Sequence, residues 1–108
     1  MQFLGDSNRL TGDVRDGVAR LGDIAIPAPG VGDGKAGLFV RPRDVDYAPS
    51  GSGLPVTVRQ VLDRPDSRRL VAATDDGEML EFDVRSDVTV NSGDRGAIAI
   101  RDGRVFAE

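Results

Sequence analysis

The chain has 108 residues, close to the commonest size of a single domain, and its 30% charged and 39% hydrophobic residues suit a soluble globular protein better than a disordered one. Its formal net charge of −4 opposes a phosphate backbone, so nucleic acid is not the expected partner. Histidine, cysteine and tryptophan are absent, which excludes His- or Cys-based triads and zinc sites, and we expect no catalytic residues, metal or cofactor.

The N-terminal segment MQFLGDSNRL lacks a basic region followed by an apolar core. No signal peptide is therefore expected, and a cytosolic chain is the default. The first predicted unit is a hairpin over about residues 9–26, with its turn at Asp16-Gly17. Both central residues of a type I′ turn need a positive φ, which Asp tolerates and Gly accepts freely, so this dipeptide is a strong hairpin signal.

Residues 26–37, IPAPGVGDGKAG, have the composition of a flexible loop. Within them, GVGDGKA has three residues between its outer glycines where a P-loop needs four, and Ala36 follows the lysine in place of Ser or Thr. The segment GDGKAG matches G-x-G-x-x-G but leads into the strand LFV and not into a helix. We expect no nucleotide site here.

A central strand is predicted over residues 37–41, with Val40 inward and Arg41 outward. It should end at Pro42, which cannot donate to a sheet ladder. Arg43 and Asp44 complete a charged corner, which we interpret first as a strand end that is solvated or paired within the chain. The alternative is a contact with a partner subunit or an anion. Exposed ion pairs contribute only about 0–1 kcal/mol, so stability alone gives little reason for these residues.

A second loop-like segment, residues 48–55, precedes a C-terminal unit over about residues 55–108. In LPVTVRQVL, Val61 is out of phase with the preceding valines, which indicates a bulge or a strand covered on both faces. Around residues 80–85, alternation assigns three residues to the core, namely Leu80, Phe82 and Val84. The arginines at 64, 68 and 69 are expected to be solvated, with Asp63 and Asp66 offsetting their charge.

Asp-Gly recurs at Asp76-Gly77 and Asp102-Gly103, which predicts two further hairpins. No segment of helical length has an apolar period of 3.6 residues, so any helix should be a single short turn. The sequence therefore predicts an all-β domain, a small OB-like antiparallel β-barrel built from hairpins.

Four segments in this order resemble the TOBE domain, the C-terminal accessory domain of ATP-binding-cassette importer ATPases, and in particular those that import sulfate and thiosulfate. They are FLGDSNRLTGDV, GLFVRPRDV, LPVTVRQVL and GDRGAIAI. The resemblance implies one TOBE/MOP-like barrel over residues 1–108 with a regulatory, dimer-stabilising role. In that family an ATPase domain precedes the position of Phe3, and none of its motifs occurs here. We therefore expect an excised or truncated domain that cannot hydrolyse ATP by itself.

The resemblance also implies partners. These are the domain's own ATPase domain and a second ATPase subunit, in a cytoplasmic assembly that is peripheral to the inner membrane and reaches it only through the transporter subunits. Interface or regulatory candidates are Phe3, Leu4, Asn8, Arg41, Arg43 and Asp44. The first two would anchor the inter-domain segment, and the side chain of Asn8 would bond backbone groups in a turn.

Two other functions remain open. A free-standing sulfate- or molybdate-binding module would need oxyanion donors, for which Ser86, Asn91 and Ser92 are candidates, although a plain polar loop is the preferred interpretation. An OB-like nucleic-acid binder would need stacking aromatics on a basic groove. The chain has four phenylalanines and one tyrosine, several of which fit a core, so this function ranks third.

Overall fold

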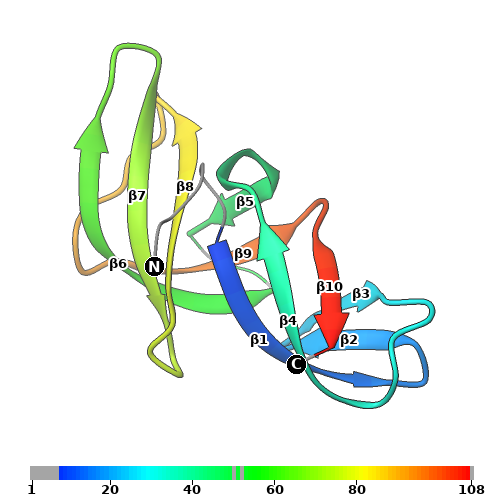
Figure 1. Ribbon diagram of the computed structural model, residues 1–108. Coiled ribbons are helices and arrows are strands. Elements are labelled where there is room, and N and C mark those ends of the chain that lie inside the picture. The colour runs from blue at the N-terminus through cyan, green and yellow to red at the C-terminus, as the bar shows by residue number, and fades with distance from the viewer. Residues whose placement is uncertain (1–7, 50, 52, 108) are drawn as a thin grey trace, which may run out of the picture.

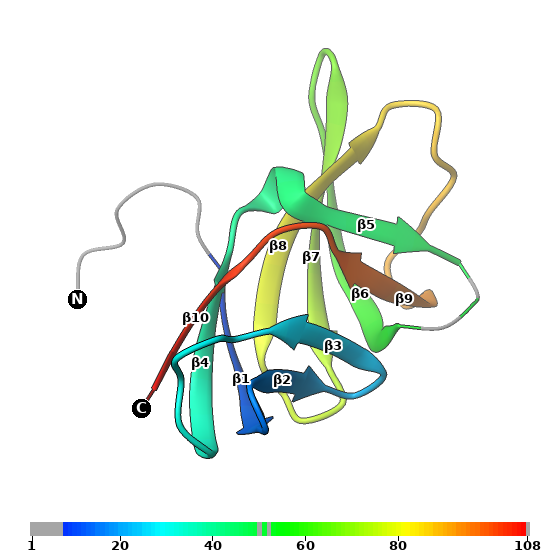
Figure 2. The same cartoon turned by 90° about the vertical axis from the view of Figure 1, so that its right-hand side faces the viewer.

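The computed structural model describes residues 8–49, 51 and 53–107, which form two five-stranded antiparallel sheets (Figure 1). Sheet A has the order β10-β4-β1-β2-β3 and contains β1 (Asn8–Arg15), β2 (Val18–Leu21), β3 (Ile24–Pro27), β4 (Gly34–Val40) and β10 (Arg104–Ala107). Sheet B has the order β5-β9-β6-β7-β8 and contains β5 (Val45–Ala48), β6 (Leu54–Asp63), β7 (Ser67–Thr74), β8 (Met79–Arg85) and β9 (Arg95–Ile100). The predicted all-β, OB-like antiparallel barrel is confirmed, since the sheets form a nearly closed barrel (Figure 2).

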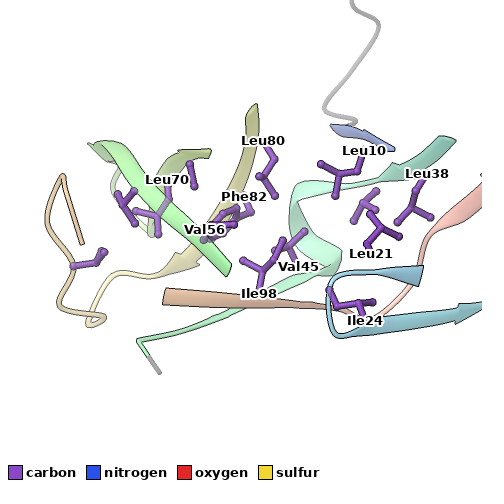
Figure 3. Close-up of a cluster of buried hydrophobic side chains, with 14 residues drawn as sticks. Leu10, Leu21, Ile24, Leu38, Val45, Val56, Leu70, Leu80, Phe82 and Ile98 are labelled. Carbon is purple, nitrogen blue, oxygen red and sulfur yellow. The ribbon is translucent and has the colours of Figure 1, made fainter. Parts of the chain in front are cut away.

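The core lies between the two sheets, where every second residue of a strand points inward. On β8, Leu80 and Phe82 are buried and Glu81 between them is exposed, as predicted. On β4, Leu38 and Val40 are buried by the same alternation. Figure 3 shows the buried side chains from both sheets in one cluster, which includes Leu10, Leu21, Leu38, Val56, Leu70, Leu80, Phe82 and Ile98.

Two of the three predicted hairpins are present. Between β1 and β2, Asp16 and Gly17 have φ of 53° and 77°, the two positive values that a type I′ turn needs. Between β7 and β8 the turn is longer. There the Gly77 N–H donates to the Thr74 carbonyl at 3.0 Å, and Gly77 alone has a positive φ, of 90°. A type I turn followed by a left-handed glycine is the usual three-residue alternative.

The third predicted hairpin, at Asp102-Gly103, is wrong. This dipeptide connects β9 in sheet B to β10 in sheet A, where β10 pairs with β4. A Cβ on Gly103 would lie 2.9 Å from Leu38 Cδ1. The glycine therefore permits a close approach between segments, and its φ is not in the region that hairpin turns require.

The flexible loop predicted over residues 26–37 is partly strand. β3 extends to Pro27 and β4 already begins at Gly34. Ala36 is buried and lies opposite Gly12 of β1. The long β1 needs a partner along its length, and β4 supplies one from Gly34 to Val40. The residues around Ala36 are Gly34, Lys35 and Gly37, which are not typical of strands, so composition alone did not predict this part of β4.

Two local predictions are confirmed, the end of β4 and the bulge in β6. Pro42 ends β4 and opens a 3₁₀ turn, η1 (Pro42–Asp44), with Val40 buried and Arg41 exposed. The register of β6 against β7 shifts between Val58 and Gln60, as the phase of Val61 predicted. In the described part of the chain this 3₁₀ turn is the helical content, and no helix there is long and apolar enough to cross a membrane.

Candidate functional site

The charged corner predicted from sequence lies on η1, between β4 and β5. The Asp44 N–H donates to the Arg41 carbonyl at 2.9 Å, which closes the turn after Pro42. The side chains of Arg41 and Arg43 are exposed, and Asp44 is half-buried. The structure thus brings the three residues together on one turn. Among the described residues, no ion pair joins Asp44 to either arginine.

Arg101, in the connection between β9 and β10, fixes this corner. Its backbone N–H donates to the Asp44 carbonyl at 2.7 Å, and its Nη2 donates to the Arg43 carbonyl. Its Nε lies 3.3 Å from Asp46 Oδ2. The corner therefore presents the guanidinium groups of Arg41 and Arg43 on an anchored backbone. Sequence reasoning missed Arg101 because its partner Arg43 is 58 positions away.

Asn8 lies where the two sheets meet and is only 8% exposed. Its Nδ2 donates to the Glu81 carbonyl and its Oδ1 accepts the Glu81 N–H, each at 2.7 Å. Nearby, the Thr11 N–H donates to Glu78 Oε1 at 3.1 Å. These bonds join β1 of sheet A to β8 of sheet B. The structure therefore gives the amide of Asn8 an intramolecular role in closing the barrel.

The expectation that Arg69 is solvated is wrong, since this residue is 6% exposed. It lies opposite Asp83 in the β7–β8 pair, and its Nε donates to Asp83 Oδ1 at 2.5 Å. Its Nη1 lies 3.2 Å from Glu81 Oε1. Cross-strand pairing therefore brings opposite charges together on one face. Glu81 bonds Asn8 through its backbone and Arg69 through its carboxylate, so the ion cluster borders the junction of the sheets.

The three oxyanion candidates lie in two exposed segments. Ser86 is in the turn after β8, while Asn91 and Ser92 belong to the loop before β9. The Ser92 hydroxyl donates to the Arg59 carbonyl at 2.8 Å. The Asn91 N–H donates to Asp94 Oδ2 at 2.9 Å. A carboxylate thus already takes a backbone donor that an anion would need, and this geometry favours the polar-loop interpretation.

Two of the interface candidates, Phe3 and Leu4, lie outside the described residues.

An aromatic pair lies on the outer face of sheet A. Phe39 is 42% exposed and stacks on Phe106, with ring centroids 4.7 Å apart and an interplanar angle of 26°. Sequence reasoning missed this pair, although a signal was present. Phe39 lies between two inward-facing residues of its strand, so alternation points it outward.

Tyr47 on β5 is half-buried, and its ring stacks on Phe82 with centroids 5.9 Å apart. Burial raises the pKa of the Tyr47 phenol, and the negative charge of Asp94 raises it further. The phenol is thus held in its neutral form more strongly in the folded than in the unfolded chain.

This shift predicts a loss of stability in alkali. An unfolded tyrosine has a pKa of about 10, so the contribution of Tyr47 is complete below about pH 10 and disappears as the pH rises through the higher folded-state pKa. We expect the free energy of unfolding to fall more steeply with alkaline pH in the parent chain than in Tyr47→Phe. Urea titrations at several alkaline pH values measure both slopes, and equal slopes would contradict the assignment.

A family model described as the CysA C-terminal regulatory domain matches residues 8–46, from β1 into β5. The Agrobacterium fabrum protein named sulfate/thiosulfate import ATP-binding protein CysA 2 is 41% identical over 107 residues, which cover 98% of this chain and 31% of that relative. Proteins named sulfate/thiosulfate import ATP-binding protein CysA from Bordetella pertussis and Bradyrhizobium diazoefficiens are 36% and 35% identical, each over 97% of this chain and over 33% and 31% of their own lengths. The chain thus spans about a third of the length of the curated relatives it matches.

Proposed function

Because the chain belongs to the family of CysA C-terminal regulatory domains, we propose that it is the regulatory and dimer-stabilising domain of an ATP-binding-cassette importer ATPase for sulfate or thiosulfate. One observation carries the proposal. A match over 98% of this chain covers only 31% of the relative, and this part is C-terminal. The folded barrel agrees with a module that is added to a separate catalytic part.

The proposed partners are the chain's own ATPase domain and a second ATPase subunit. Two identical subunits associate by two-fold symmetry, so the same surface of each domain would meet its copy or the neighbouring ATPase domain. The corner on η1 suits a contact with the neighbouring ATPase domain, because Arg101 holds its backbone while Arg41 and Arg43 extend into solvent, where two copies of the corner would repel each other. The assembly would lie in the cytoplasm, peripheral to the inner membrane, and reach the membrane through the transporter subunits.

The proposed domain is not itself an enzyme. Its sequence has no histidine or cysteine, and its Gly-rich segment lacks the spacing of a P-loop. That segment is largely committed to structure, since β4 starts at Gly34 and leaves no helix N-terminus for a phosphate. The proposed domain would therefore contribute association and regulation, while the ATPase part performs the hydrolysis.

A chimaera tests this role. The ATPase part of the Agrobacterium fabrum relative is joined to this chain in place of its own C-terminal part and is compared with the ATPase part alone. Sedimentation equilibrium measures the dimer dissociation constant of each. We expect the chimaera to dimerise at least about tenfold more tightly, a gain of about 1.4 kcal/mol.

The double variant Arg41→Glu/Arg43→Glu reverses the charge of the corner and should remove much of this gain. The control is the single charge reversal Arg20→Glu, because Arg20 is also exposed but lies on β2. A chimaera that associates no better than the ATPase part alone would refute the proposed function. An effect of Arg20→Glu as large as that of the double variant would remove the corner from it.

A further inference from the structure

The outer face of sheet A has a feature that the proposed function does not use. The strands β1, β4 and β10 lie side by side in Figure 1. Five of their residues define what we call the aromatic surface, namely Arg9, Gly37, Phe39, Arg104 and Phe106. Arg9 and Arg104 lie opposite Phe39 on its two sides, and Phe106 lies opposite Gly37. A Cβ on Gly37 would come within 2.4 Å of Phe106 Cζ. The glycine therefore makes the space in which the Phe106 ring lies flat.

The fold does not need an aromatic side chain at residue 39. The core receives Leu38 and Val40 from this strand, while Phe39 stays 42% exposed even after it stacks on Phe106. The Arg9 guanidinium lies 5.6 Å from the Phe106 ring centroid, within the range of a cation–π contact. Arg104 is exposed and makes no ion pair with any described residue. Aromatic and arginine side chains together are typical of the centres of protein interfaces.

The path of the chain indicates which partner lies within reach. β1 begins at Asn8, and the next residue, Arg9, already belongs to the aromatic surface. The domain that the proposed function places before this chain is joined to it on the N-terminal side of β1, and therefore at the edge of this surface. A covalent connection raises the effective concentration of a neighbouring domain, so a small interface suffices.

We propose that the aromatic surface is the docking site of the ATPase domain that precedes the barrel in the full-length protein. This proposal rests on the proposed function, which supplies that domain. The face that docks here carries an apolar recess for Phe39 and carboxylates that pair with Arg104. Positive charge next to an exposed ring selects such a face.

A second copy of this chain fits the surface less well. A symmetric contact through it would bring the Arg104 charges of two copies toward each other, and like charges at an interface cost binding energy. The corner on η1 begins two residues after Phe39, where the chain leaves β4, and Arg101 holds it. The proposal assigns the aromatic surface to the domain's own ATPase domain and the corner to the second subunit.

Hydroxyl-radical footprinting read by mass spectrometry tests the proposal on the chimaera described above and on the chain alone. We expect Phe39 and Phe106 to be oxidised several-fold more slowly in the chimaera. Met79 is the internal control, because it is 51% exposed and lies on β8 of sheet B. Its oxidation rate should be the same in both proteins.

Charge reversal supplies the matched pair of variants. In the chimaera, Arg104→Glu should restore the oxidation rate of Phe39 to that of the free chain. Arg64→Glu, in the exposed β6–β7 loop, should leave Phe39 protected. Equal rates for Phe39 in chimaera and free chain overturn the proposal. A Phe39 that is already protected in the free chain also overturns the proposal. Protection that persists on dilution would indicate cover by the N-terminal segment. Protection that disappears on dilution would indicate a contact between copies.

The two proposals fail in distinguishable ways. A chimaera that dimerises tightly while Phe39 remains reactive refutes the docking site and leaves the proposed function intact. A chimaera that protects Phe39 but associates no better than the ATPase part alone refutes the dimer-stabilising role and supports the docking site.

Discussion

Replacing Phe82 with alanine is expected to lower the free energy of unfolding by about 3–5 kcal/mol. The side chain is 0% exposed and lies in the middle of the core cluster (Figure 3). It also stacks on Tyr47, so it connects β8 to β5 on the other edge of sheet B. Domains of this size have a total stability of about 5–15 kcal/mol, so the variant loses a large part of it.

Met79→Ala is the matched control for Phe82→Ala. It truncates a large apolar residue on the same strand, but Met79 is 51% exposed, so a change within about 0.5 kcal/mol is expected. Phe82→Leu, which keeps most of the volume, should fall between the two. Urea denaturation followed by far-UV circular dichroism measures all three, since the chain has no tryptophan. Nearly equal midpoints for Phe82→Ala and Met79→Ala would contradict the position of Phe82 in the core.

The burial of Phe82 was predictable because it depends on a local rule. Alternation within one strand assigns faces without knowledge of the partner strand, and it placed Leu80, Phe82 and Glu81 correctly. Turn chemistry is equally local, which explains the success at Asp16-Gly17. The same chemistry failed at Asp102-Gly103, because the choice between a hairpin and a crossover depends on which strand edge is open elsewhere. Here β10 pairs with the free edge of β4 and not with β9, so the dipeptide connects the two sheets.

The candidate site was less predictable, since its contacts join segments that are distant in sequence. The corner on η1 was visible as a strand end, but not the clamp by Arg101, whose partner Arg43 is 58 positions away. Asn8 could be expected to bond backbone groups. The strand that it bonds, through Glu81, lies 73 positions away, and no local pattern identifies it. Burial of Arg69 depends likewise on the pairing of β7 with β8.

Asn8→Ala is expected to cost about 2–4 kcal/mol of stability, because it removes two hydrogen bonds and leaves the Glu81 N–H and carbonyl without partners at the junction of the sheets. Asn91→Ala is the matched control, since Asn91 is exposed and its hydrogen bonds to Asp94 are made by its backbone N–H and carbonyl. That variant should stay within about 0.5 kcal/mol of the parent. Urea denaturation gives the global effect. Hydrogen exchange at the Glu81 amide gives the local effect, and it should become faster in Asn8→Ala alone.

Asn8→Asp separates the two hydrogen bonds. The carboxylate keeps an acceptor for the Glu81 N–H but turns a negative oxygen toward the Glu81 carbonyl, which previously accepted from Nδ2. Burial and this repulsion favour the protonated acid, whose hydroxyl donates to the carbonyl again, so the folded-state pKa of the new group lies above its unfolded value of about 3.9. The stabilising contribution is therefore complete below about pH 4 and disappears as the pH rises through the folded-state pKa. Relative to Asn8→Ala, we expect Asn8→Asp to gain stability on acidification from about pH 7 to about pH 4. A constant difference between the two variants over this range would show that the Asn8 side chain does not donate to the Glu81 carbonyl, and that β1 and β8 are held together by other contacts.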